Sequence, residues 1–258
     1  LIYMLLIYGA LSAELIPIYT KVFTKNAEEA DEFASQILNL ILFLLIFVLA
    51  AAYFLMPWIF PYIAPGFDDT SIATSINLSR IMLLSPLFLA ISSVLQGVEN
   101  SKKLFWGVSL APILYNLAII FSAIFFGETY GVYALAYGVV IAALLHFAIQ
   151  IPFTVHSGFK YKIIFFRQIK NLKNFFKLSF SRILGGAVVQ IGFLIDTVIA
   201  TLIGLGTLSV FNYAFNLQSL PYAVVGVSFS LAIFSTLAQK SDDKKEFASI
   251  VQNSIYNV

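Results

Sequence analysis

Long apolar runs alternate with short polar gaps along the chain, and this pattern predicts a bundle of membrane-spanning helices. Each of seven runs has the ~20 residues needed to cross a bilayer core. The runs cover residues 1–20, 34–63, 72–98, 104–126, 131–155, 178–205 and 209–238. Backbone groups in lipid must be hydrogen-bonded within the chain, and the runs lack the alternation of barrel strands. The predicted fold class is therefore all-α: a polytopic transmembrane helical bundle with about seven complete spans.

Basic residues fall into alternate gaps, and this gives the predicted bundle an orientation. The first, third, fifth and seventh gaps hold lysines or arginines, whereas the gaps 64–71, 127–130 and 206–208 hold none. By the positive-inside rule the basic gaps are cytoplasmic. The first run then crosses from outside to inside. We expect the chain to be a fragment that begins inside a span and ends at the start of another helix, 246–258.

The composition argues against a soluble protein. Hydrophobic residues make up 60% of the chain and charged residues only 11%, where a soluble domain has about 25% charged residues. The net charge is only +2, and the basic residues lie at helix ends. This distribution favours contact with membrane lipids over a binding surface for nucleic acid. With no cysteine, disulfides and thiolate metal sites are excluded, and His146 and His156 lack ligand-like spacing to a carboxylate. No catalytic constellation is visible, so we expect no enzyme, no metal and no cofactor.

One gap, residues 157–177, is long, basic and amphipathic. We expect it to lie on the cytoplasmic membrane surface, with its apolar side chains down and its lysines toward anionic lipid. It divides the chain into an N-terminal lobe, 1–156, a connector, 157–177, and the start of a C-terminal lobe, 178–258. The sequence Glu-Phe-Ala-Ser at 32–35 recurs at 246–249, which favours two similar, parallel lobes, a known transporter plan.

Polar residues within the apolar runs are the candidates for a substrate cavity: Ser12, Arg182, Gln190, Asp196, Asn212 and Asn216. An ionised Asp196 in mid-span would cost at least ~2.5–3.5 kcal/mol, so it faces a cavity or a partner. It is either a cation or proton site, part of the substrate cavity, or a packing contact. Asn212 and Asn216 share a helix face and either line water or join helices. Arg182 either grips a diphosphate or reaches the interface.

Three other polar features receive structural interpretations. The acidic run 28–32 is interpreted as a solvated helix start. Arg80 is expected to extend to the outer interface, and His146 to be a packing residue. Pro112 is expected to kink its helix and free a carbonyl.

Several motifs follow one another in a collinear order: Gly9-Ala10-Leu11-Ser12-Ala13 with Pro17, Ala64-Pro65-Gly66-Phe67, Arg80-Ile81-Met82, Ala111-Pro112-Ile113-Leu114-Tyr115-Asn116, Leu184-Gly185 with Gln190 and Ile195-Asp196-Thr197, and Asn212-Tyr213-Ala214 with Leu217-Gln218, Pro221 and Gly226. As a set they resemble the MurJ/MviN family of lipid II flippases, in the multidrug/oligosaccharidyl-lipid/polysaccharide exporter superfamily. The resemblance implies helices two to eight of a fourteen-helix, two-lobed exporter in the bacterial cytoplasmic membrane. It also implies that lipid II, a lipid-linked peptidoglycan precursor, is flipped by alternating access for cell-wall synthesis.

The chain departs from this family at two places. Arginines that the family carries early in helix two are Tyr3 and Met4 here, and its Ala-Asp-Arg-Leu in helix eight has Phe215 and Asn216 at the second and third positions. The resemblance assigns those arginines to the lipid diphosphate, so Arg182, Asn212 and Asn216 are the expected substitutes. Three functions stay open: a lipid II flippase, a Na⁺- or H⁺-coupled multidrug or polysaccharide-lipid exporter, and a non-transporting scaffold.

Overall fold

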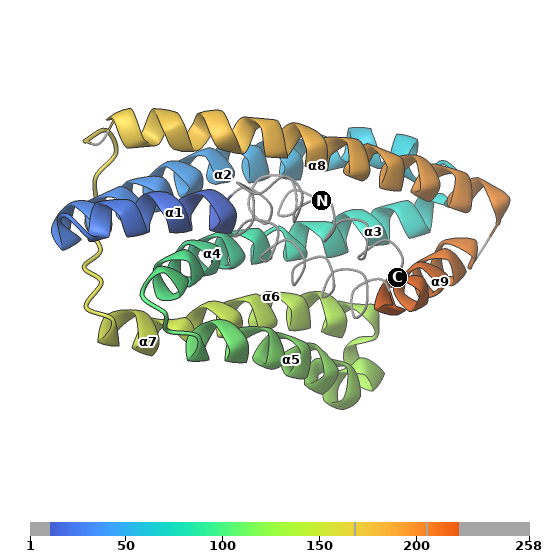
Figure 1. The fold of residues 1–258 in the computed structure, drawn as a ribbon. Helices are drawn as coiled ribbons and strands as arrows, with labels where there is room; N and C mark the ends of the chain where they lie inside the picture. Colours follow the sequence, from blue (N-terminus) through green and yellow to red (C-terminus); the bar gives the residue numbers. More distant parts are fainter. Residues whose placement is uncertain (1–10, 168, 205, 222–258) are drawn as a thin grey trace, which may run out of the picture. The chain divides into compact units, whose positions relative to one another are not determined.

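The computed structural model describes residues 11–167, 169–204 and 206–221, and all regular structure in these residues is helical (Figure 1). The described helices are α1 (Leu11–Phe23), α2 (Ala27–Ile63), α3 (Asp69–Met82), α4 (Ser85–Ser101), α5 (Trp106–Tyr130), α6 (Val132–Ala148), α7 (Gln150–His156), α8 (Ile169–Ile203) and α9 (Thr207–Pro221). The all-α prediction is confirmed.

Five described stretches are long and apolar enough to cross a membrane: Ala27–Ile63, Asp69–Ser101, Trp106–Tyr130, Val132–His156 and Ile183–Ile203. They correspond to five of the seven predicted spans. The two remaining runs, 1–20 and 209–238, extend into residues outside the described part, as do the second copy of the short repeat and the expected helix start at 246–258.

Two of the spans are each divided into two helices by a proline. α3 gives way to α4 just before Pro86, whose missing N–H leaves the carbonyl of Met82 without its helical donor. The Ser85 hydroxyl donates to that carbonyl at 2.7 Å. α6 gives way to α7 at Ile149, shortly before Pro152. Each span therefore stays continuous in direction although its backbone hydrogen bonding is interrupted.

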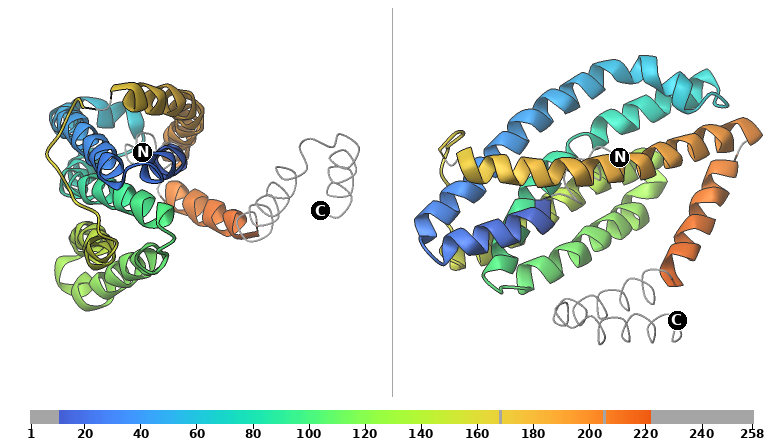
Figure 2. Two further views of the ribbon diagram at one scale, coloured as in Figure 1. Left: turned by 60° about the vertical axis from the view of Figure 1, so that its left-hand side comes forward. Right: turned by 45° about the horizontal axis from the view of Figure 1, so that its top comes forward.

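The first compact unit, Leu1–Leu202, is organised around α4, which packs against α1, α2, α5, α6 and α7. Its apolar core joins α1, α2 and α4 through buried side chains such as Leu15, Phe33 and Val94. α5 lies along α6 on another side of α4, as Figures 1 and 2 show. The second unit, Ile203–Val258, contains α9 and is described by itself.

α8 contacts the N-terminal part of the first unit near both of its ends. Near the start of both helices the Phe175 ring packs edge-on against the Phe33 ring, with centroids 6.4 Å apart. Beyond the far end of α2, the backbone of Gly66 lies against the Thr201 carbonyl, and a Cβ at residue 66 would be 1.8 Å from that oxygen. Only glycine permits this approach. α8 is thus attached to the N-terminal helices at both of its ends.

The basic residues of the connecting segments gather at one end of the first unit. At this end α1, α4 and α7 finish and α2, α5 and α8 begin (Figure 1). We call it the basic end; it holds Lys21, Lys25, Lys102, Lys103, Lys160 and Lys162. The predicted connector 157–177 has two parts here: residues 159–167 form no helix, and α8 begins at Ile169. The lobe boundaries 1–156, 157–177 and 178–258 stay predictions.

Candidate functional site

The non-helical residues 159–167, which we call the strap, are held against the first three turns of α2. Asn26 caps this helix by accepting hydrogen bonds from the backbone N–H groups of Glu28 and Glu29. Three polar side chains of α2 then bond the strap: Ser35 accepts from the Lys162 N–H, Gln36 donates to the Phe165 carbonyl, and Asn39 donates to the Lys162 and Ile164 carbonyls. They supply the partners that an irregular backbone needs.

Two buried carboxylates of α2 anchor the same segment. Glu32 accepts from Lys162 at 3.0 Å and from Arg167 at 2.7 Å. Asp31 accepts from the Tyr19 hydroxyl at 2.7 Å and from the Lys160 backbone N–H at 3.0 Å. The prediction of a solvated acidic run was wrong for these two residues, because the strap, more than a hundred residues away in the sequence, covers them.

The pKa values of two lysines outside the spans shift in opposite directions. The carboxylates of Glu28 and Glu32 raise the pKa of Lys162 above its ordinary value. Burial lowers the pKa of Lys102, against the opposing attraction of Asp31, whose Oδ1 lies 3.9 Å from the Lys102 Nζ. The Lys102 Nζ also donates to the Ser157 carbonyl at 3.1 Å. The basic end therefore carries paired charge that joins α2, α4 and the strap.

On α8 the structure places the sequence-predicted residues on different sides of the helix. Gln190 is half-buried, whereas Asp196 is exposed. Asp196 lies in line with Val189, Gly192 and Gly185, at the spacing of one helix face, and this whole line is exposed. A Cβ built on either glycine would meet no atom within 4 Å. We call residues 185, 189, 192 and 196 the open strip. The side chain of Arg182 lies outside the described part.

The polar residues of α9 share one helix. Asn212 donates to the Leu208 carbonyl at 2.9 Å, and Asn216 is exposed. Because α9 belongs to the second unit, the predicted meeting of Asp196 with Asn212 and Asn216 around a cavity stays a prediction. Ser12 lies in α1, and its side chain is outside the described part.

A buried polar seam that sequence reasoning did not find joins α4 to α6 and α7. The Ser92 hydroxyl lies 2.7 Å from Nδ1 of His146 and accepts from the Gln150 amide at 2.6 Å. The Thr154 hydroxyl donates to Glu99 at 2.7 Å. The signal was present in the sequence, since residues 146, 150 and 154 follow one another at four-residue intervals on one helix face. Among the described residues, no three His, Cys, Asp or Glu side chains come together as metal ligands.

Arg80 has a partner on α2, and its expected extension to the outer interface stays a prediction. Its guanidinium lies 4.5 Å from the Tyr53 ring centroid, and Nε and Nη2 each lie 3.4 Å from the Tyr53 carbonyl oxygen. That carbonyl is the one freed by Pro57, four residues on in α2. Arg80 therefore supplies the donor that Pro57 withholds. In α5 the carbonyl that Pro112 frees is that of Val108, whereas the Asn116 side chain donates to the carbonyl of Pro112 itself at 2.9 Å, so the satisfaction of the freed carbonyl stays a prediction.

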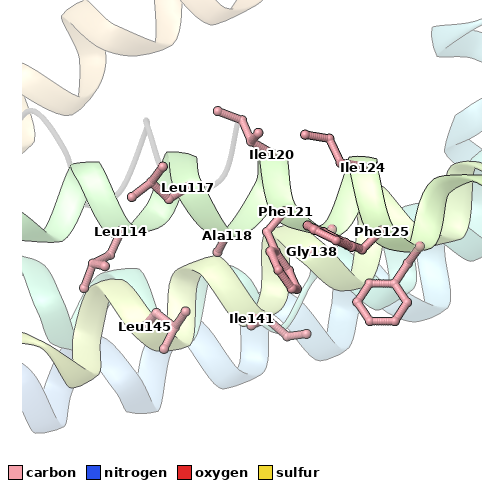
Figure 3. A pocket seen from close by; sticks show the side chains of 12 residues that line it. Leu114, Leu117, Ala118, Ile120, Phe121, Ile124, Phe125, Gly138, Ile141 and Leu145 are labelled. Carbon is pink, nitrogen blue, oxygen red and sulfur yellow. The ribbon is translucent and has the colours of Figure 1, made fainter.

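The membrane-facing side of α5 and α6 is apolar. A groove of about 580 Å³ runs between these helices, and Figure 3 shows Phe121 extending from α5 toward α6 with Phe125 beside it. The hydroxyl of Ser122, which also lines the groove, donates to the Ala134 carbonyl at 2.6 Å. The groove therefore offers apolar surface, in keeping with contact to acyl chains.

Comparison with known proteins places the chain in one group. The family described as "MurJ: Lipid II flippase MurJ" matches residues 1–257. A "Probable lipid II flippase MurJ" of Buchnera aphidicola is 30% identical over 194 residues, which are 73% of this chain and 38% of that protein. The "Lipid II flippase MurJ" of Burkholderia cenocepacia is 28% identical over 200 residues, 71% of this chain and 37% of that protein.

A solved structure is similar as well. "Lipid II flippase MurJ, inward closed conformation" superposes with a TM-score of 0.76 at 26% identity, covering 95% of this chain and 50% of that one. The chain therefore spans half or less of the length of these proteins. Its multi-pass, all-helical character in the bacterial inner membrane follows from the likeness together with the five described spans.

Proposed function

The chain belongs to the lipid II flippase MurJ family, and from this premise we propose that it forms part of a transporter that flips a lipid-linked peptidoglycan precursor across the cytoplasmic membrane. The observation that carries the proposal is the family match over residues 1–257. In alternating access the head group enters a polar cavity between two lobes while the lipid tail stays in the bilayer. Membership of this family therefore supports a transporter, which moves its substrate without a covalent step.

The open strip of α8 supports a role for Asp196 in that cavity. A carboxylate in a membrane span needs water, a cation or a polar group beside it. The glycines above it leave room for such a group, and no described side chain fills that room. We propose that Asp196 lines the cavity and binds a cation, Na⁺ or H⁺, that couples to substrate movement. Gln190, Arg182, Ser12, Asn212 and Asn216 are proposed as further polar contacts of the head group.

The contacts of α8 with α2 and with the loop that follows α2 support a mechanical route between the lobes. Phe175 packs on Phe33 at one end of the helices and Thr201 packs on Gly66 at the other. The strap adds the ion pairs of Glu32 next to the start of α8. A movement of α8 against the N-terminal helices must therefore break or slide these contacts.

A complementation experiment tests the proposal. The full-length protein is expressed in a strain depleted of its own lipid II flippase, and growth and cytoplasmic lipid II are measured. The wild type should restore growth and prevent the precursor from accumulating. Asp196→Asn should rescue less well than Arg80→Gln at matched expression, because glutamine still donates to the Tyr53 carbonyl.

Two outcomes would count against these assignments. Drug resistance conferred without any rescue of the cell wall would favour an ion-coupled exporter. Full rescue by Asp196→Asn together with failure of Arg80→Gln would show that the charge needed for transport lies on α3 and that its assignment to α8 is wrong.

A further inference from the structure

Among the residues whose burial the structure describes, three carboxylates of the first unit are almost completely buried, and one of them differs from the others. Asp31, Glu32 and Glu99 are 5%, 3% and 0% exposed. Glu32 pairs with Lys162 and Arg167, and Asp31 has a lysine and two hydrogen-bond donors around it. Glu99 forms no ion pair among the described residues. Its oxygen Oε1 accepts from Thr154, and its other oxygen, Oε2, has no hydrogen-bond partner there.

The surroundings of Glu99 do not suit an ionised group. Its carboxylate lies between the end of α4 and the start of α5, where a Cβ on Gly107 would be 2.4 Å from Oε2. The ring of Phe153 lies beside the same glycine, 3.0 Å from that built Cβ. The Thr154 hydroxyl and the Val108 backbone N–H favour the ionised form, but burial without a cation outweighs them, so the carboxylate takes up a proton in preference to staying charged.

No cation in the neighbourhood compensates the carboxylate. Lys102 is one helical turn further along α4, but its Nζ is directed to the Ser157 carbonyl, Asp31 and the Phe23 ring. His146, two turns away along the seam, is held by Ser92. Other titratable groups on the helices packed against α4 include Tyr19 on α1, which donates to Asp31, Tyr115 on α5, whose ring packs edge-on against His146, and the exposed His156 on α7.

A second unpartnered oxygen belongs to the same seam. Gln150 is fully buried, its amide nitrogen donates to Ser92, and its Oε1 has no partner among the described residues. Gln150 precedes Thr154, the donor to Glu99, by one turn of helix. The seam therefore holds two oxygen acceptors in excess of its hydrogen-bond donors, and one additional proton reduces that excess.

We propose that Glu99 is a proton-binding site at the basic end, formed with Thr154 and the space left by Gly107. The ligand is a single proton, held as the neutral carboxylic acid while α4, α5 and α7 are packed together. The proton leaves when water enters between these helices, so the protonation of Glu99 and the closure of this end are coupled. The inference does not depend on which substrate the protein moves.

Infrared spectroscopy of the purified full-length protein in lipid bilayers tests the site, because a protonated carboxyl and an ionised carboxylate absorb in separate regions. At neutral pH the wild type should show a protonated-carboxyl band that Glu99→Gln lacks. Glu32→Gln is the matched control: it removes a buried but ion-paired carboxylate and should leave that band unchanged. Thr154→Val deletes the donor to Oε1 and should shift the same band, which keeps the test open if Glu99→Gln fails to fold.

Thermal unfolding gives a second readout. The melting temperature of Glu99→Gln should rise relative to that of the wild type as the pH rises. Only the wild type has to bind a proton when it folds and release it when it unfolds, and this becomes less favourable at higher pH. The proposal is overturned if the folded wild type has no Glu99-dependent band at neutral pH. It is also overturned if the band emerges only when Na⁺ is removed, which would assign the site to a metal cation.

Discussion

The pairing of Arg80 with the carbonyl freed by Pro57 leads to a quantitative prediction. Tyr53 is ten residues before the end of α2, or about 15 Å from that end at 1.5 Å per residue. Among the described residues, the Arg80 guanidinium is the side-chain donor to this carbonyl. An unsatisfied buried carbonyl costs ~1–3 kcal/mol, and the long 3.4 Å contacts favour the lower half of that range. The contact with the Tyr53 ring contributes a further ~0.5–1 kcal/mol.

Arg80→Leu should therefore lower the free energy of unfolding by ~1.5–3 kcal/mol, since it removes both contacts at once. Pro57→Ala restores the backbone N–H that the Tyr53 carbonyl needs. In the Pro57→Ala background the cost of Arg80→Leu should fall by ~1–2 kcal/mol, which is the share of the carbonyl. Equilibrium unfolding of the purified protein in mixed micelles measures all four members of this cycle.

A matched control uses the neighbouring proline of the same helix. Pro61 frees the carbonyl of Pro57, and Arg80 is bonded to the Tyr53 carbonyl instead. Pro61→Ala and Arg80→Leu should therefore be additive within ~0.5 kcal/mol. Additivity of Pro57→Ala with Arg80→Leu would refute the reasoning, because it would mean that the guanidinium does not replace the missing donor.

Three further predictions concern the orientation, the basic end and the start of α3. Cysteine introduced as Glu128→Cys should react with an impermeant thiol reagent from outside the cell and Lys103→Cys should not, and the reverse pattern would overturn the orientation. Lys162→Met should speed proteolysis of the strap equally at neutral and mildly alkaline pH. Glu28 and Glu32 raise the pKa of Lys162, so the stability that this lysine contributes is complete below its ordinary pKa of 10.5 and is lost only as the pH rises through the raised value. Hydrogen bonds from Ser71 and Thr70 lower the pKa of Asp68. The start of α3 should therefore lose protection from hydrogen exchange as the pH falls below the ordinary value of 3.8, and Asp68→Asn should remove this dependence on pH.

The spans were predictable because hydropathy alone decides them. A run such as 104–126 has no alternative to a helix in lipid, and α5 at Trp106–Tyr130 differs from it only at the ends. The breaks at Leu84 and Ile149 were less visible, since a proline in a membrane helix either bends it or divides it according to which neighbour supplies the missing donor. At the break between α3 and α4 the donor is Ser85, a local residue that the apolar pattern does not single out.

The buried charges were not predictable in the same way. Asp31 and Glu32 stand in an acidic run at a helix start, which in most proteins is solvated. They are buried here because the strap, with Lys160 and Lys162, returns to them from more than a hundred residues away. Glu99 stands near the end of a span, where a charged residue ordinarily reaches water, and it is closed off by Thr154 and the α5 backbone. Periodicity on one helix does not reveal what covers it.

The most direct test of the central claim is translocation of lipid II by the full-length protein in sealed vesicles. Lipid II with a chemically accessible head group is placed in one leaflet, and an impermeant reagent measures how much of it reaches the other. The account predicts protein-dependent transfer that falls in Asp196→Asn and is kept in Arg80→Gln. A folded wild-type protein that leaves all of the head groups in their original leaflet would contradict it.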